Sequence, residues 1–265
     1  MALAESFGMI VRNPLALFRV SAFWFPVYLM SHLCWIYWDY AALGMSDPDG
    51  VKPGIFSQWS PVFIVLATAI TVLSFIGIAI VAIAWHRFFL KGEVPSSLLI
   101  WPKGWAVKRY FWTMVLLVLF SLPFLFVFMF FYMGSFDGIE STNTNLYGFW
   151  GMFIPSVIFY MVVSFFGLVF LAIALGVRLR LSASVELMSQ HLGTVLVLIF
   201  VLATMNSISI VLSEEFVDPG LGLFRWLSFL ASESVFWFFV LVEVGVLSSL
   251  YRQLGLPLSI GEQAS

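Results

Sequence analysis

The sequence predicts an all-α protein that is embedded in a membrane and crosses it with six transmembrane helices. Hydrophobic residues make up 62% of the chain and charged residues only 10%, which is too little polar surface to cover a soluble globule. The apolar residues gather in stretches long enough to cross a hydrocarbon core of about 30 Å as helices. Lys and Arg concentrate in every second connection between these stretches, which is the pattern of short cytoplasmic loops.

The connection between the second and third stretches, residues 85–110, has the densest positive charge in the chain. Its Lys and Arg residues are Arg87, Lys91, Lys103, Lys108 and Arg109, and its one acid is Glu93. Because such connections stay in the cytoplasm, this segment is predicted to be cytoplasmic. The same five bases are candidates for contacts with anionic lipid headgroups, although the topology rule alone accounts for them.

The six predicted spans cover about residues 15–40, 61–85, 110–133, 149–177, 193–212 and 226–250. The fourth span is longer than a hydrocarbon core of about 30 Å needs, so we expect it to tilt or protrude. We expect Pro26 to kink the first span.

The second span has a face of small residues, which lets the backbone of another helix approach closely. That face consists of Ala67, Thr71, Ser74 and Gly77. The third and fourth spans are rich in Phe instead. We therefore expect the second span to be central and the third and fourth to face lipid.

Amphipathic segments are predicted to lie in the membrane interface before the first, third and fifth spans. The first has Leu3, Phe7, Ile10 and Val11 on one helical face. The second carries Trp101 and Trp105, one helical turn apart. The third, residues 181–192, has Val185, Met188 and Leu192 on one face.

This layout separates bases from acids across the membrane. The inner side holds Arg12, Arg19, Arg87, Lys91, Lys103, Lys108, Arg109, Arg178, Arg180 and Arg252, and the outer side holds Lys52 and Arg225. Eight acids fall outside and four inside. Both termini are therefore predicted to be cytoplasmic.

An interfacial segment followed by a helical hairpin occurs three times, and each hairpin ends in a basic turn. Pro26 follows Arg12 by fourteen residues, and Pro123 follows Arg109 by the same number. The pattern predicts three repeated hairpins in parallel orientation, whereas many secondary transporters have inverted repeats.

Two acids, Glu233 and Glu243, lie within the last span, where a charge costs at least about 2.5 kcal/mol. Glu233 lies about seven residues from the outer end of its span, as do Asn206 and His32, so the three could form one polar layer. Such a layer could be a proton- or ion-binding site, or an interhelical hydrogen-bond cluster around a protonated Glu233. Glu243 has Ser21 among its candidate partners.

Other kinds of site are not expected. Cys34 is the single cysteine, which excludes a disulfide or a cysteine-based metal cluster within one chain. His86 and His191 lie beside bases at the cytoplasmic boundary and are expected to be solvated. No catalytic motif occurs on a loop, so we expect no cofactor, no metal ion and no nucleic-acid partner.

The basic helix ends AWHRFFLKGE, VRLRLS and LYRQLG resemble those of a bacterial family of six-helix inner-membrane proteins of uncharacterised role. That family is similar to the membrane domain that precedes some glycerophosphodiester phosphodiesterases. The resemblance implies a helical bundle in the bacterial cytoplasmic membrane. It does not imply phosphodiesterase activity, since Phe88 follows His86-Arg87 where the His-Arg-Gly motif of those enzymes needs glycine.

The sequence therefore favours a non-enzymatic membrane protein, an accessory or scaffold subunit that works through helix and lipid contacts. Its expected partners are membrane lipids and either another membrane protein or a second copy of the chain. The alternative is a small proton- or ion-linked transporter that uses Glu233 and His32. A continuous polar lining through the bilayer would favour transport, and dispersed polar groups would favour the scaffold.

Overall fold

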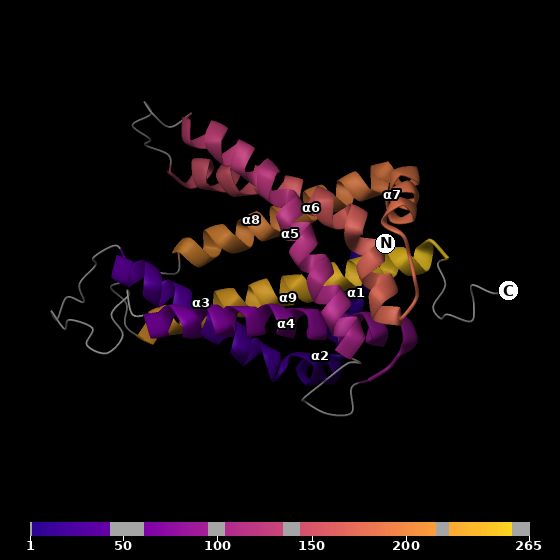
Figure 1. The fold of residues 1–265 in the computed structure, drawn as a ribbon, viewed down its shortest axis with the longest axis horizontal. Helices are drawn as coiled ribbons and strands as arrows, with labels where there is room; N and C mark the ends of the chain where they lie inside the picture. Colours follow the sequence, from indigo (N-terminus) through magenta and orange to yellow (C-terminus); the bar gives the residue numbers. More distant parts are fainter. Residues whose placement is uncertain (1, 43–60, 95–103, 135–143, 216–222, 256–265) are drawn as a thin grey trace.

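The computed structural model describes residues 2–42, 61–94, 104–134, 144–215 and 223–255, and this part of the chain is helical apart from short turns (Figure 1). The helices are α1 (Ala2–Arg12), α2 (Pro14–Ser21), α3 (Trp24–Ala42), α4 (Pro61–Lys91), α5 (Gly104–Gly134), α6 (Thr144–Leu175), α7 (Leu181–Gln190), α8 (Leu192–Glu215) and α9 (Leu223–Gln253).

Four segments are long and apolar enough to cross a membrane by themselves. They are Pro61–Lys91, Gly104–Phe124, Phe153–Leu175 and Phe229–Gln253. Two bent pairs also qualify if each is taken as one span: α2 with α3, bent by 54°, and α7 with α8, bent by 96°. The described residues thus give four to six candidate spans, which confirms the predicted all-α polytopic membrane fold.

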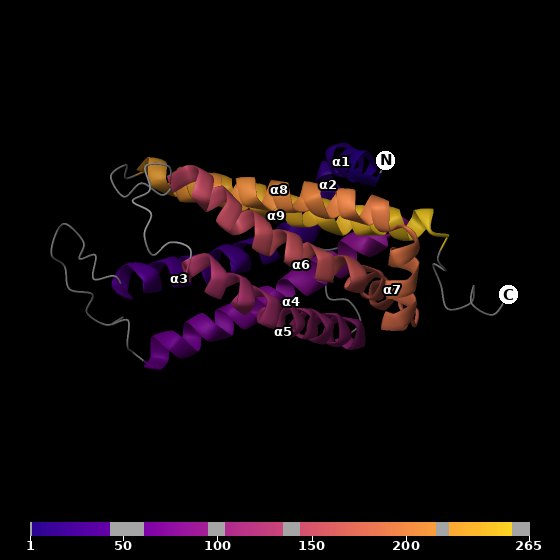
Figure 2. The same cartoon turned by 90° about the horizontal axis from the view of Figure 1, so that it is seen from above.

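The helices pack around α4, α6 and α9. In Figure 1, α9 runs along α4, and α5 crosses this pair steeply before it diverges from them. Seen from above, α8 lies beside α9 (Figure 2). The start of α1, α7 and the end of α9 lie at the same end of the bundle, and the α3 end that carries Ala42 lies at the other.

The fourth predicted span is central, so its expected place toward lipid is wrong. In the apolar 18-residue stretch of the α6 span Phe153–Leu175, 56% of the residues are buried, against 22% in the corresponding stretch of α5. α6 packs against α4, α5, α7, α8 and α9, and a helix with neighbours on so many sides exposes little surface to lipid. α5 has the exposed apolar face that was expected of a lipid-facing helix, with Leu116, Phe120 and Phe126 on it.

The helix α3 packs against the small-residue face of α4. Ala67, Ser74 and Gly77 are buried. The Trp24 ring lies over Gly77, and the Ser31 hydroxyl donates to Thr71 Oγ1 at 3.2 Å. Close approach at small residues, with a hydrogen bond between the helices, is the usual way in which helices associate in lipid.

The first predicted span is broken between α2 and α3, at Ala22 and Phe23. Pro26 has no N–H to donate to the carbonyl of Ala22, four residues earlier, so the helix ladder is interrupted at this turn. The bend therefore lies upstream of the proline that causes it. Pro123 does not have the same effect, because α5 continues through it. The two prolines thus mark different local structures, and the threefold repeat stays a prediction.

The helix α1 packs against α9 with most of the expected face: Ile10 is buried, and Leu3 and Phe7 pack against the core, with the Phe7 ring next to Phe238 of α9. Ser6 is also buried, whereas Val11 is 71% exposed. The buried face is set by Ser6, whose hydroxyl donates to the carbonyl of Val242 at 2.9 Å beside the bare backbone of Gly245.

In α7 the buried residues are Ser184 and Met188, while Val185 and Leu192, which were expected on the same face, are exposed. The Ser184 hydroxyl donates to the Phe165 carbonyl at 2.6 Å, which turns this side of α7 toward α6. Trp105 belongs to the first turn of α5, and Trp101 lies outside the described residues.

We predict that Gly77→Ala destabilises the protein by about 1–3 kcal/mol, because overpacking of a filled core has this cost. An added Cβ would lie 2.5 Å from Trp24 Cε3, and the buried ring has little room to move. Gly8→Ala is the control, since nothing lies within 4 Å of its added Cβ. Thermal unfolding in detergent should show a lower midpoint for Gly77→Ala only; equal midpoints would contradict this packing.

Candidate functional site

Glu233 of α9 is bonded to two residues of α3. The Tyr28 hydroxyl donates to Glu233 Oε2 at 2.7 Å, and His32 Nδ1 lies 3.3 Å from Glu233 Oε1. The two α3 residues are four apart and so share one face of the helix. The sequence predicts that His32 and Glu233 lie at similar depth. It does not indicate that Tyr28 also bonds to Glu233.

The three side chains differ in their access to the surroundings. Tyr28 is 3% exposed and the Glu233 side chain 11%, whereas the His32 side chain is 43% exposed. The Tyr28 ring lies against His32, Phe236 and Trp237, with ring centroids 4.4, 6.0 and 5.1 Å away. Tyr28 is therefore held in place as a donor to the carboxyl group, and His32 is the most exposed of the three side chains.

Asn206 does not join this group, so the predicted three-residue layer is not formed as expected. Its Nδ2 donates to Ser156 Oγ at 3.0 Å and so links α8 to α6. His32 and Asn206 lie about ten residues before the ends of α3 and α8, and Glu233 about ten after the start of α9. The three residues thus lie at similar distances from the ends of their helices, but Asn206 has a different partner, because position along one helix does not say which helices are neighbours.

Glu243 also has a partner that was not expected. The Tyr160 hydroxyl of α6 donates to Glu243 Oε1. The proposed partner Ser21 instead accepts a hydrogen bond from Trp237 Nε1 at 3.0 Å, which links α2 to α9. The two acids of α9 are therefore bonded to different helices, Glu233 to α3 and Glu243 to α6.

His86 is fully buried, so the expectation of a solvated histidine is wrong. Its Nδ1 lies 2.8 Å from Ser248 Oγ and its Nε2 3.3 Å from the Tyr110 hydroxyl. The Ser248 hydroxyl donates its proton to the Val244 carbonyl, so the Nδ1–H of His86 must donate to Ser248 and Nε2 must accept from Tyr110. This pattern fits a neutral imidazole that joins α4, α5 and α9. His191, by contrast, is exposed.

The basic segment is divided by the structure. Arg87 donates to both oxygens of Glu93, from Nε at 2.7 Å and from Nη2 at 3.2 Å. The Arg87 hydrogen bonds hold the pKa of the Glu93 carboxyl below its ordinary value, aided by the charges of Arg87 and Lys91 and opposed by partial burial. Lys91, Lys108 and Arg109 are exposed, and Lys103 lies outside the described residues.

A further polar cluster ties the first helix to the last. Glu5 pairs with Arg252 and accepts a hydrogen bond from Ser249, and the Arg252 guanidinium lies over the Phe89 ring at 5.6 Å. Sequence reasoning missed this cluster, because Glu5 and Arg252 lie at opposite ends of the chain. The one available signal was an acid inside an apolar N-terminal segment.

Among the described residues, no group of three or more His, Cys, Asp or Glu side chains is arranged to hold a metal ion. Comparisons with known proteins gave no match: no family model, no curated protein and no solved structure matches the chain. The role of these polar groups is therefore inferred from their geometry.

We predict that His86→Ala destabilises the protein by about 2–4 kcal/mol. The substitution leaves a cavity and removes the partners of two buried hydroxyl groups. His191→Ala, at an exposed position near the same end of the bundle, should change stability by less than about 0.5 kcal/mol. Thermal unfolding in detergent measures both. Similar losses for the two variants would contradict the buried position of His86.

Proposed function

We propose that the protein is a non-enzymatic accessory or scaffold subunit of the membrane, which acts through helix and lipid contacts. The observation that carries this proposal is the separation of the polar groups within the spans. Glu233 is bonded to α3, Glu243 to α6, Asn206 to α6 from α8, and His86 to α5 and α9. Each group links two or three helices.

A transport path needs polar groups that follow one another through the bilayer. A scaffold needs polar groups that bond across separate helix interfaces. The distribution of hydrogen bonds supports the second arrangement. The exposed apolar face of α5 offers a surface for lipid or for a helix of another subunit, which fits the same role.

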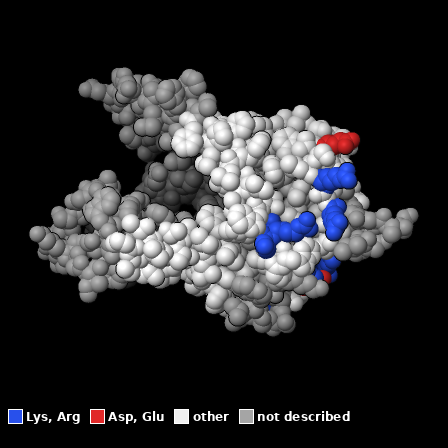
Figure 3. Space-filling model, in the orientation of Figure 1, with Lys and Arg blue, Asp and Glu red and all other residues white. Residues whose placement is uncertain are grey.

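In this proposal the chain crosses the bacterial inner membrane six times, with both termini in the cytoplasm. α8 has 24 residues, which gives a length of about 36 Å, comparable to the thickness of the hydrocarbon core, and it qualifies as a span together with α7. The exposed bases support the orientation, because those in view gather toward the end of the bundle where α7 lies (Figure 3). The resemblance to the six-helix inner-membrane family agrees with this arrangement.

The alternative function, a small proton- or ion-linked transporter, has one specific observation in its favour. Glu233 is a buried acid within a candidate span, and its neighbour His32 is much more exposed. Such a pair can exchange a proton between a buried and an accessible position.

A proton-flux measurement separates the two functions. We expect the purified full-length protein in liposomes to carry no more protons than empty liposomes under a pH gradient. Glu233→Gln should unfold within a few degrees of wild type, since the amide keeps the size of the carboxyl group and can accept from Tyr28. Proton flux in wild type that Glu233→Gln abolishes, but His191→Gln keeps, would establish the transporter instead.

Reporter fusions test the orientation. We expect a fusion inserted at Ser97 and one placed after Ser265 both to report the cytoplasm, because each follows a basic helix end. An enzymatic reporter that is active only outside the cytoplasm provides the matched control. An external signal at either position would contradict the six-span arrangement.

A further inference from the structure

Two basic segments that are far apart in the sequence meet where α5 begins and α6 ends. α6 is closed by Gly176, whose φ of +82° suits glycine, and the N–H of Val177 returns to the Ala172 carbonyl at 2.9 Å. The Trp105 ring lies 3.8 Å from the place that a Cβ on Gly176 would take. The first turn of α5 therefore rests on the turn that ends α6.

On the α5 side, Lys108 and Arg109 are three and four residues after Trp105, so they share its face of the helix. Both bases are exposed, and Trp105 is 46% exposed. The opposite face of the same turn is buried through Ala106 and Val107. The face that carries Trp105 and the two bases is thus turned outward.

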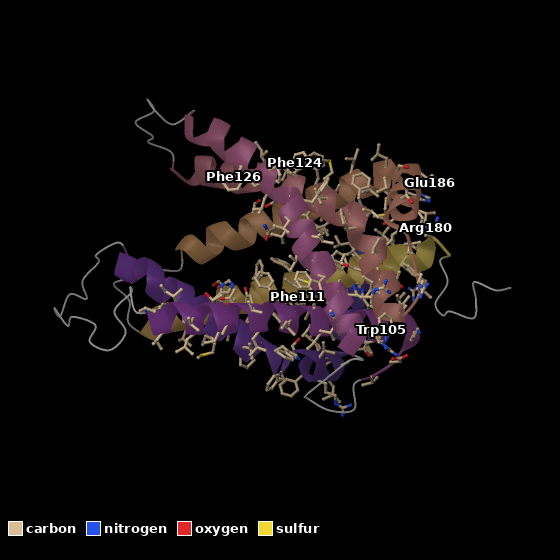
Figure 4. The ribbon with its side chains drawn as sticks, viewed as in Figure 1. Trp105, Phe111, Phe124, Phe126, Arg180 and Glu186 are labelled. Carbon is tan, nitrogen blue, oxygen red and sulfur yellow. The ribbon has the colours of Figure 1, made fainter. Side chains whose placement is uncertain are left out.

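On the α6 side, Arg180 has an extended backbone, and the exposure of the side chains alternates from Val177 to Arg180. Val177 is buried and Leu179 packs against the core, so Arg178 and Arg180 are exposed on the other side. Figure 4 places Arg180 at the end of α7 nearer to Trp105, with Glu186 beyond it. The four bases and Trp105 are called the headgroup surface below.

This surface has an excess of positive charge. Lys108, Arg109 and Arg180 form no ion pair within the part of the chain that the structure describes, whereas Glu93 and Glu5 are engaged by Arg87 and Arg252. A half-exposed Trp beside clustered bases at the end of transmembrane helices matches the level of lipid headgroups.

We propose that the headgroup surface binds the phosphate of an anionic phospholipid. The bases of α5 and those that follow α6 approach the lipid phosphates, while the Trp105 ring lies beside them at the headgroup level. These contacts differ from those expected from the sequence. Arg87 is left out because it is paired with Glu93, and Arg178 and Arg180 from a distant segment are added. This inference rests on the proposed function in one respect, since the proposed function includes contact with lipid.

Native mass spectrometry of the full-length protein in mild detergent tests the inference. Phosphatidylglycerol is titrated against phosphatidylcholine. We expect a preference for phosphatidylglycerol that falls about fivefold or more in Arg178→Gln/Arg180→Gln and in Lys108→Gln/Arg109→Gln. The matched control is Arg12→Gln/Arg19→Gln, which removes the same charge from α1 and α2 and should keep the preference. All the substituted bases are exposed except Arg19, which is half-buried, and thermal unfolding checks that each variant is folded.

Equal losses in the control and in the two surface variants, or no preference in wild type, would overturn the inference. Inorganic phosphate distinguishes the source of the phosphate group: millimolar phosphate that displaces the lipid completely would indicate a site for the free anion. A protein partner found without any lipid preference would overturn this inference and leave the proposed function intact.

Discussion

The contacts of α9 with the helices around it hold the described bundle together. In lipid there is no hydrophobic force to drive helices together, so close packing and interhelical hydrogen bonds must do so. α9 supplies such bonds along its length: Glu233 to α3, Trp237 to α2, Glu243 to α6 and Ser248 to α4. At its end, Ser249 and Arg252 add Glu5 of α1. The acids in this span are thus part of the assembly of the fold.

This arrangement bears directly on function. A carboxyl group within a transmembrane helix normally has a hydrogen-bonding partner or a function. Here Tyr28 is the hydrogen-bond donor to Glu233, and Tyr160 is the donor to Glu243. The phenol groups come from different helices, so the two acids stabilise two separate interfaces. Hydrogen bonds between helices thus engage the two acids, and the exposed apolar face of α5 and the exposed bases are the surfaces on which the proposed function depends.

The sequence predicts the properties of single helices better than the contacts between helices. The all-α polytopic membrane fold, the small-residue face of α4 and the bend caused by Pro26 follow from composition and helical period. The sequence does not show which helices are neighbours, because the apolar faces of membrane helices have similar sequences. Hence Asn206 was assigned to the wrong partner, His86 to solvent and α6 to the lipid boundary.

In the proposed function, the protein works as a subunit among other membrane components. Purification of the full-length protein from its native membrane in mild detergent, with co-purifying proteins identified by quantitative mass spectrometry, tests this role most directly. We expect a membrane-protein partner in stoichiometric amount, which stays bound in Glu233→Gln. A protein that purifies alone and carries protons in liposomes would contradict the role of a subunit.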